Sequence, residues 1–384
     1  MNHLRDLFLL RPEITYLNHG SFGACPKPVF ETYQNWQLEL EREPVEFLGR
    51  RFADLMYEAR RALAKFLHTG VDDLLFVTNA STGLNYVAQS LPLRPGDEVL
   101  TTDQEYGAMD RMWGMICRRS GTRYIRRPLP LPLSGSPEEV AETIWSGVTE
   151  HTKILFISHV TSATALTLPV FLLAQRARQA GILLAVDGAH GPGQIDLDLT
   201  ASGVDFYAGN CHKWMLAPKG AAFLYVRPEL QNLIRPLIIS WADLSRAQSR
   251  FIQENEFQGT RDIAAYLSVP AAISFMKNHH WAEVRRQCRR LALYAQEKMS
   301  QICGLPPLCP GSPDWIQQMV AQQLPAEIDG EKLRERLFKE YAIEIPVNQI
   351  NGKEYIRISV QGYNTADDVN KFLEAFDELR RKMA

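Results

Sequence analysis

The feature that most constrains the fold is a regular alternation of short apolar runs and helical patterns between residues 74 and 226. The runs are "LLFVTN" (74–79), "EVLTTD" (98–103), "KILFISHV" (153–160), "ILLAVDGAH" (182–190), "VDFYAGN" (204–210) and "AAFLYV" (221–226). Helix-like stretches such as "STGLNYVAQSL" and "LPVFLLAQRARQAG" lie between several of them. Buried strands that alternate with helices are typical of a sheet covered on both faces. We therefore predict an α/β fold with a mostly parallel sheet and helices on both faces.

The pattern changes near Pro270. One or two long helices are expected from residue 271, followed by the helical stretch "DGEKLRERLFKEYA", the strand "EYIRISV" and a last helix. Thr365 and Asp368 form a start for that helix that is similar to a capping box. This mixture predicts a smaller α+β domain. We divide the chain into an N-terminal segment (1–15), a large domain (16–270) and a small C-terminal domain (271–384).

Composition and charge exclude several kinds of partner. The formal net charge is −2 and no basic run is present, so we expect no nucleic-acid partner. No apolar run approaches the roughly 20 residues that a membrane helix needs, and the N-terminus lacks the pattern of a signal peptide. None of the six cysteines forms a C-x-x-C pair, and no His/Cys cluster has metal-ligand spacing. We expect a cytoplasmic protein with reduced thiols and no metal.

Polar residues follow the apolar runs at the point where each run ends. In open α/β sheets, ligands bind beyond the carboxyl ends of the strands, so these residues should meet at one edge. They are Asn79–Thr82, Glu105 with Tyr106, Thr161 with Ser162, Asp187 with His190, and Asn210 with His212 and Lys213.

Each of these groups has a chemical use and an ordinary structural alternative. The turn "NASTG" opens a helix whose first N–H groups suit a phosphate, although Ser81 and Thr82 are also common helix caps. Asp187 follows an apolar run, so it needs a cation or acts as a cap. Lys213 is either an exposed loop lysine or, if desolvated, an amine nucleophile. A lysine, a carboxylate, a phosphate site and an aromatic ring together are typical of a pyridoxal phosphate site.

The motifs that carry these residues resemble a known family. "VDGAHGPGQIDLDL" followed by "CHKW" is similar to the class V branch of the fold-type I pyridoxal phosphate enzymes. "LNHGSFG", "TNAST", "HVTSATALTLPV" and "GTRD" most resemble the isopenicillin N epimerase-like group. The resemblance spans residues 16–365. It implies a fold-type I large domain, a smaller C-terminal domain, pyridoxal 5'-phosphate as cofactor, and a homodimer.

The resemblance implies roles for the residues around the cofactor ring. Lys213 would form the Schiff base and Asp187 would pair with the pyridinium nitrogen. His190 would bond the phenolic oxygen or the Schiff base, and Tyr106 would stack on the ring. Ser162 falls where cysteine desulfurases place an asparagine near the phenolic oxygen.

The resemblance also implies phosphate and substrate contacts. Thr260 matches a residue that reaches the phosphate of the neighbouring subunit, which gives a homodimer with shared active sites. The substrate side would hold Asn18, His19 and Arg357. Arg357 lies on one face of the alternating strand "EYIRISV" and would bind the α-carboxylate of an amino acid, with a structural acid as the alternative partner. The phosphate positions are Ala80, Ser81, Thr82, Asn210 and His212.

The expected chemistry starts at the Cα or Cβ of an amino acid, with Lys213 as the general base. Epimerisation is nearest by motif and needs a second acid, for which His19 and Tyr106 are candidates. A carbon–sulfur β-lyase acting on cysteine conjugates or sulfoxides and an aminotransferase are alternatives, as is a protein of this fold that binds without catalysis. A cysteine desulfurase is disfavoured because residues 340–356, which precede Arg357, contain no cysteine.

Overall fold

The large sheet is mostly parallel, as predicted. A computed structural model describes residues 4–241 and 249–383. The sheet has the strand order β2-β8-β7-β6-β5-β3-β4, and only β8 runs antiparallel to its neighbours. Its strands are β2 (Leu74–Val77), β3 (Glu98–Thr102), β4 (Arg123–Arg127), β5 (Thr152–Ser158), β6 (Leu183–Gly188), β7 (Phe206–Asn210) and β8 (Ala222–Val226). The edge strand β4, "RYIRR", was not expected because its residues are mostly polar.

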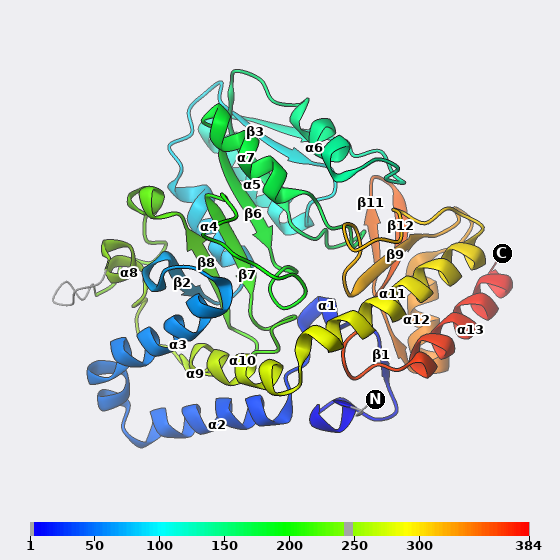
Figure 1. Cartoon of the computed structure of the whole chain (residues 1–384), viewed down its shortest axis with the longest axis horizontal. Helices are drawn as coiled ribbons and strands as arrows, with labels where there is room; N and C mark the ends of the chain where they lie inside the picture. The colour runs from blue at the N-terminus through cyan, green and yellow to red at the C-terminus, as the bar shows by residue number, and fades with distance from the viewer. Residues whose placement is uncertain (1–3, 242–248, 384) are drawn as a thin grey trace.

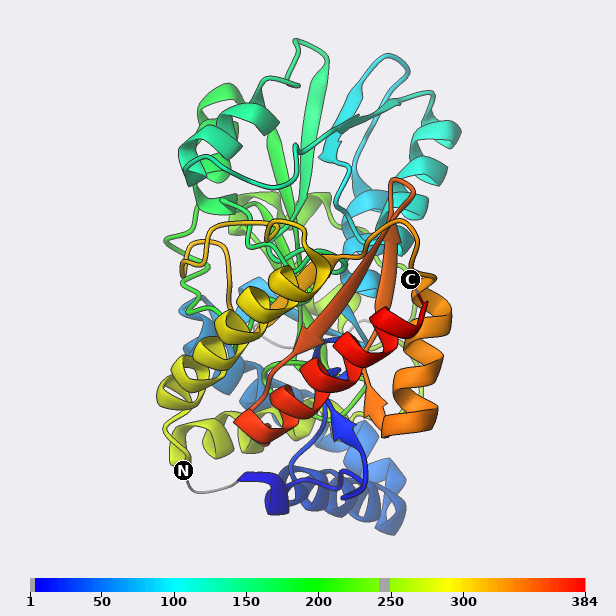
Figure 2. The same ribbon diagram turned by 90° about the vertical axis from the view of Figure 1, so that its right-hand side faces the viewer.

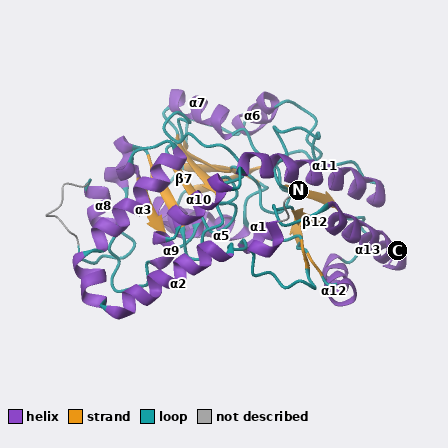
Figure 3. Ribbon diagram, turned by 60° about the horizontal axis from the view of Figure 1, so that its bottom comes forward, coloured by secondary structure: helices purple, strands orange, loops and turns teal. Residues whose placement is uncertain are grey.

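Helices cover both faces of this sheet (Figure 3). In β2, Leu74 and Phe76 belong to one buried apolar cluster and Leu75 and Val77 to the other, because alternate side chains point to opposite faces. Burial on both faces explains why the runs are continuously apolar rather than alternating. The helices of this part are α2 (Lys27–Arg42), α3 (Phe52–Leu67), α4 (Ala80–Ser90), α5 (Gly107–Ser120), α6 (Pro137–Trp145), α7 (Val170–Ala180), α8 (Arg250–Asn255), α9 (Ala264–Leu267) and α10 (Val269–Asn278).

A small antiparallel sheet follows in the C-terminal part. Its order is β11 (Val347–Ile350), β12 (Lys353–Ser359) and β9 (Met319–Gln323). Figure 2 shows it behind the helices α11 (Trp281–Cys303), α12 (Gly330–Tyr341) and α13 (Ala366–Met383). The predicted capping box is present before α13, since Thr365 N donates to Asp368 Oδ2 at 3.0 Å and Asp368 N donates to Thr365 Oγ1 at 3.3 Å.

Two neighbouring helices differ in their packing partners. Helix α10 packs against α2 and α3, whereas α11 packs against β9. The domain boundary at residue 270 stays a prediction.

Turns of 3-10 helix lie at Leu4–Leu7, Val71–Asp73 and Pro228–Leu233, and a π-helical turn lies at Glu46–Arg50.

The N-terminal residues join the two sheets. Strand β1 (Thr15–Tyr16) pairs with β10 (Ile343–Glu344), and helix α1 (His19–Phe22) lies between the large and small sheets (Figure 1). Gly23, which follows α1, has a φ of 73°, and a Cβ there would lie 2.0 Å from the carbonyl oxygen of His212. Only glycine therefore lets this segment approach the loop after β7. No helix in the described residues is long and apolar enough to cross a membrane.

Candidate active site

A cavity of about 570 Å³ lies at the carboxyl ends of the parallel strands and reaches β12 of the small sheet. This size is usual for a site that binds a small molecule. Most of the residues predicted from the sequence line it. They are Ala80, Ser81, Tyr106, Ser162, Asp187, His190, Asn210, His212, Lys213 and Arg357.

The amine of Lys213 lies 3.2 Å from His190 Nε2. On the other side of that ring, Trp214 Nε1 donates a hydrogen bond to His190 Nδ1 at 3.2 Å. An indole N–H can only donate, so Nδ1 is the acceptor and the proton of a neutral His190 is on Nε2. Burial, together with the charges of Lys213 and Arg357, lowers the pKa of His190 well below its usual value. His190 is therefore a neutral group with a fixed N–H directed at the lysine.

Lys213 is almost fully buried. Burial and the nearby charge of Arg357 lower the pKa of its amine to about 8, while Asp187 acts in the opposite direction. The amine is therefore mostly charged at pH 7, but its neutral, nucleophilic form is far more populated than in an exposed lysine.

Two buried carboxyl groups influence each other here, Asp187 near the end of β6 and Glu105 in the loop after β3. Asp187 Oδ1 accepts a hydrogen bond from the Ala189 N–H at 2.9 Å, and burial raises the pKa of Asp187. Ser158, the register partner of Asp187, donates from its backbone N–H and its hydroxyl to Glu105 Oε2, at 2.8 and 2.5 Å. Among the described residues, neither carboxyl forms an ion pair.

The start of helix α4 forms another wall of the cavity. The Asn79 side chain caps it by accepting from the Thr82 N–H at 2.9 Å, and Asn210 Oδ1 accepts from the Ala80 N–H at 2.8 Å. Ser81, in the same first turn, lines the cavity with its neighbour Ala80. Burial and Lys213 lower the pKa of His212, which also lines the cavity, to about 4.

Arg357 enters the cavity from β12. It is 2% exposed, its Nη1 donates to the carbonyl oxygen of Ser162, and its Nη2 donates to Ser21 Oγ at 3.2 Å. Its Nε is buried without a hydrogen-bond partner, and no carboxylate of the described residues forms an ion pair with it. The alternative of a structural acid is therefore wrong for this part of the chain. Burial lowers the pKa of the guanidinium to about 10, so it carries its charge at neutral pH.

His19 and Asn18, the substrate-side residues expected from "LNHGSFG", do not line the cavity but contact residues that do. His19 Nε2 lies 3.0 Å from the Lys213 carbonyl oxygen and Nδ1 lies 2.9 Å from the Tyr363 hydroxyl. Burial lowers the pKa of His19 to about 3, and the ring does not line the cavity. The expectation that His19 supplies a proton to a substrate is corrected, since it holds the Lys213 backbone. Asn18 Oδ1 accepts from the Ser21 hydroxyl at 2.6 Å, so it orients the partner of Arg357 rather than lining the cavity.

Two further predicted residues lie away from the cavity. Thr82 uses its N–H and hydroxyl on Asn79, and its hydroxyl also lies 2.9 Å from the Thr78 hydroxyl. Thr260 is exposed on the loop after α8. Its predicted contact is with a neighbouring subunit and stays a prediction.

Several lining residues were not singled out from the sequence. Ser21 and Phe22 come from α1, and Asn348 comes from β11. One signal could have found Asn348, because Asn351 and Gly352 both have positive φ and join β11 to β12 as an Asn-Gly hairpin. That hairpin pairs Asn348 with the strand of Arg357.

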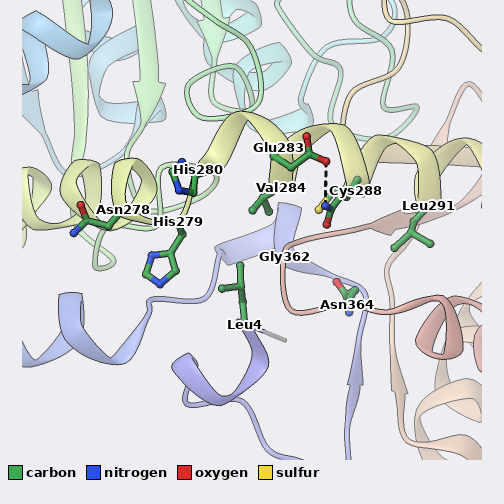
Figure 4. Close-up of a pocket in the computed structure, with 11 residues that line it drawn as sticks. Leu4, Asn278, His279, His280, Glu283, Val284, Cys288, Leu291, Gly362 and Asn364 are labelled. Carbon is green, nitrogen blue, oxygen red and sulfur yellow. Dashed lines mark hydrogen bonds between the residues drawn. The ribbon is translucent and has the colours of Figure 1, made fainter. Parts of the chain in front are cut away.

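A second cavity, of about 400 Å³, lies where α10 meets α11 (Figure 4). It is lined by His279, His280, Glu283 and Cys288, among others, and by none of the predicted site residues. His279 bonds the Phe275 carbonyl oxygen at 2.8 Å through Nδ1. No group of three or more possible metal ligands occurs in the described ranges 4–241 and 249–383.

The first cavity fits pyridoxal phosphate by the chemistry of its groups. An aldehyde needs an amine, a pyridine nitrogen needs an acid beside it, and a phosphate needs N–H and hydroxyl donors. Lys213, Asp187 and the first turn of α4 offer these groups, and the buried carboxylate of Asp187 forms no ion pair among the described residues, although the charge of Lys213 acts on it. Half-exposed Tyr106 lies on the same cavity, where it would contact the ring.

Comparison with known proteins agrees with this donor set. The family model described as "Aminotransferase class-V" matches residues 24–372. An isopenicillin N epimerase of Amycolatopsis lactamdurans is 36% identical, with 98% of each chain covered. A probable chloroplastic L-cysteine desulfhydrase of Arabidopsis thaliana is 27% identical over 96% of this chain and 84% of its own.

Solved structures show the same fold. A mutant of C-DES with glycine covalently linked to its PLP cofactor superimposes with a TM-score of 0.85 at 21% identity, over 97% of this chain and 99% of the other. The cysteine desulfurase CsdA of Escherichia coli gives 0.81 at 22% identity, over 99% and 98%. With the family model covering most of its length, the chain belongs to the class V aminotransferase family of pyridoxal phosphate-dependent enzymes.

Proposed function

We propose that this enzyme removes the Cα proton of an amino acid and epimerises it. The observation that carries this proposal is Arg357, a buried guanidinium that shares the cavity with the Lys213 amine and has no acidic partner among the described residues. A free α-carboxylate is the ligand that such a group binds best. The isopenicillin N epimerase at 36% identity supports this reaction type.

The residues divide the work as follows. Arg357 binds and orients the carboxylate, and Ser21 and Ser162 hold the guanidinium in place. Pyridoxal phosphate, when bound, draws electrons away from Cα. Lys213 then accepts the Cα proton at Nζ, which the lowered pKa of its amine permits. His190 keeps its Nε2–H directed at this centre, and Asp187 supplies negative charge at the pyridine position.

Return of the proton from the opposite side needs a second acid. Of the two residues expected for this task, only Tyr106 lines the cavity. If no group performs it, the same site suits a carbon–sulfur β-lyase, which needs only a leaving group on Cβ. The cysteine desulfhydrase relative favours this second candidate. Among the residues that the structure describes, no cysteine lines the cavity, which argues against a desulfurase thiol.

The test uses purified protein with pyridoxal phosphate and a panel of L-amino acids and cysteine conjugates in heavy water. Deuterium at Cα together with the D-isomer and no pyruvate supports the epimerase. Pyruvate from the conjugates instead supports the β-lyase, and a new keto acid with an aminated cofactor supports transamination. Absence of both cofactor absorbance and exchange would overturn the proposal in favour of a binding protein without catalysis.

We also propose that the enzyme is a cytoplasmic homodimer. Phe22 and Tyr106 line the cavity yet are 70% and 48% exposed, which suits a mouth that a second copy covers. Light scattering would give the mass of the particle. If Thr260 serves the partner's phosphate, a mixture of Lys213→Ala and Thr260→Ala chains should contain hybrid dimers with one intact site. A monomer in solution would contradict the shared site.

A further inference from the structure

Asn348 lines the cavity and takes no part in the proposed carboxylate binding or proton transfer. It lies on β11, and its Nδ2 is a buried donor without a hydrogen-bond partner in the described structure. A buried amide that lacks an acceptor costs free energy, so such groups are uncommon unless a ligand supplies the acceptor.

The position of Asn348 relative to Arg357 follows from the register of the hairpin. Asn348 pairs with Tyr355 of β12, and Arg357 lies two residues further along the same strand. Residues two apart on a strand point to the same face, so Asn348 and Arg357 are diagonal neighbours on one face. Both line the cavity, which confirms that this face is directed into it.

The two side chains reach to different depths. The Nη atoms of Arg357 extend to Ser162, in the loop between β5 and α7, and to Ser21 of α1. Asparagine is much shorter than arginine, so its amide stays closer to the hairpin. A ligand whose α-carboxylate is held at the Nη atoms therefore presents another part of itself to Asn348.

The hairpin is held over the cavity by a bond at its tip. Asn351 Nδ2 donates to Asp103 Oδ2 at 2.6 Å, and Asp103 precedes Tyr106 in the loop between β3 and α5. Asp103 Oδ1 in turn accepts from the Leu129 N–H at 3.0 Å. This contact between the two parts of the molecule keeps Asn348 at a defined place, as a selective contact requires.

We infer that Asn348 selects substrates whose side chain carries an oxygen acceptor, by donating a hydrogen bond from Nδ2 to that oxygen. This inference rests on the proposed function, since it assumes that the α-carboxylate lies on Arg357. It makes Asn348 a specificity-determining residue rather than part of the proton transfer.

The test compares two ligands that differ by one oxygen, L-methionine sulfoxide and L-methionine. Their dissociation constants are measured from the change in visible absorption of the cofactor-loaded protein. We expect the sulfoxide to bind about 10-fold more tightly to the wild type, as one buried hydrogen bond allows. In Asn348→Leu, which is similar in size, the ratio should fall to about 1. In Asn348→Asp, which offers an acceptor in place of the donor, the sulfoxide should lose its advantage.

Gln349→Leu is the matched control, because Gln349 is the exposed neighbour on the opposite face of β11, and its ratio should stay at the wild-type value. A ratio that Asn348→Leu leaves unchanged, or an equal weakening of both ligands, would overturn the inference while leaving the proposed function intact. If neither amino acid changes the spectrum of the wild type while other amino acids of the panel do, the inference is overturned and the proposed function stands. If no amino acid of the panel does, the proposed function fails and the inference fails with it.

Discussion

Trp214 Nε1 donates to His190 Nδ1 at 3.2 Å, and this bond decides which nitrogen of His190 carries the proton. Trp214 follows Lys213 directly in the chain and is fully buried. The residue next to Lys213 in the chain therefore sets the hydrogen-bonding role of the histidine that faces the Lys213 amine.

Replacing Trp214 by Phe should release His190 from a single tautomer. The ring loses the donor at Nδ1, so we expect both neutral forms and a loss of about 1 kcal/mol in stability. Nitrogen-15 NMR of the histidine ring measures the protonated nitrogen directly. A ring that remains entirely in the Nε2–H form in Trp214→Phe would show that another group sets the tautomer.

Lys213→Met should stabilise the cofactor-free protein at pH 7. Burial lowers the pKa of the folded-state amine to about 8, so the folded state binds fewer protons than the unfolded state between that pH and the usual pKa. Wild-type stability then rises with pH through this window, and below it the buried charge costs about 3 kcal/mol. Urea unfolding at pH 7 and pH 10 should give a gain for Lys213→Met that shrinks at pH 10. The exposed Lys277→Met serves as control and should show no such gain.

Substitution by Met should lower the stability of the protein at one buried arginine, Arg60, and weaken substrate binding at another, Arg357. Arg60 is ion-paired with buried Glu256, so Arg60→Met should lose about 3–5 kcal/mol in stability and keep its KM. In the described part of the chain Arg357 has no acid to leave unpaired, so Arg357→Met should stay folded but raise KM at least about 30-fold, corresponding to about 2 kcal/mol or more. Arg357→Lys should recover part of this loss, because it keeps the charge without the forked donors. An unchanged KM in Arg357→Met would remove the carboxylate from this position.

Glu105→Gln should stabilise the protein more at pH 8 than at pH 5. Burial raises the pKa of Glu105 to about 7, so the folded state binds more protons than the unfolded state between its usual pKa and pH 7. Stability is therefore lost as the pH rises through that window, and the variant should recover about 3 kcal/mol at pH 8. Glu98 on β3 is the contrast, because it is also buried but is ion-paired with Arg123. Glu98→Gln should therefore be destabilising. Equal effects of Glu105→Gln at both pH values would mean that Glu105 does not titrate there.

Tyr106→Phe separates removal of the Cα proton from its return. The side chain is half exposed, so folding should be unaffected. If Tyr106 is the second acid, deuterium exchange at Cα should continue while D-isomer formation slows by about 100-fold or more. Chiral chromatography and mass spectrometry of the same reaction give both rates. Parallel changes in the two rates would assign Tyr106 to cofactor binding alone.

The predictions from sequence succeed where the information is local. Buried strands end at a polar residue, and parallel strands bring those ends to one edge, so Asp187, Asn210 and Lys213 could be placed together from their positions alone. Strand β4 was not predicted, because an edge strand with mostly polar residues lacks the apolar pattern of a buried strand. The hairpin that carries Asn348 was not predicted either, although "NQINGKEY" contains the turn sequence Asn351-Gly352.

By itself, the amino-acid sequence determined all strands of a mostly parallel sheet except β4, and it placed most of the cavity-lining polar residues at one edge of that sheet. It also determined the family, through motifs that stay intact over most of the chain. Only the tertiary structure decided that His19 supports the Lys213 backbone, that Ser21 meets Arg357, and that Asn348 lines the same cavity. These contacts join segments far apart in the chain, and they depend on how the small sheet and α1 dock against the large sheet. Periodicity within a segment reports which face is buried but not which distant side chain it meets.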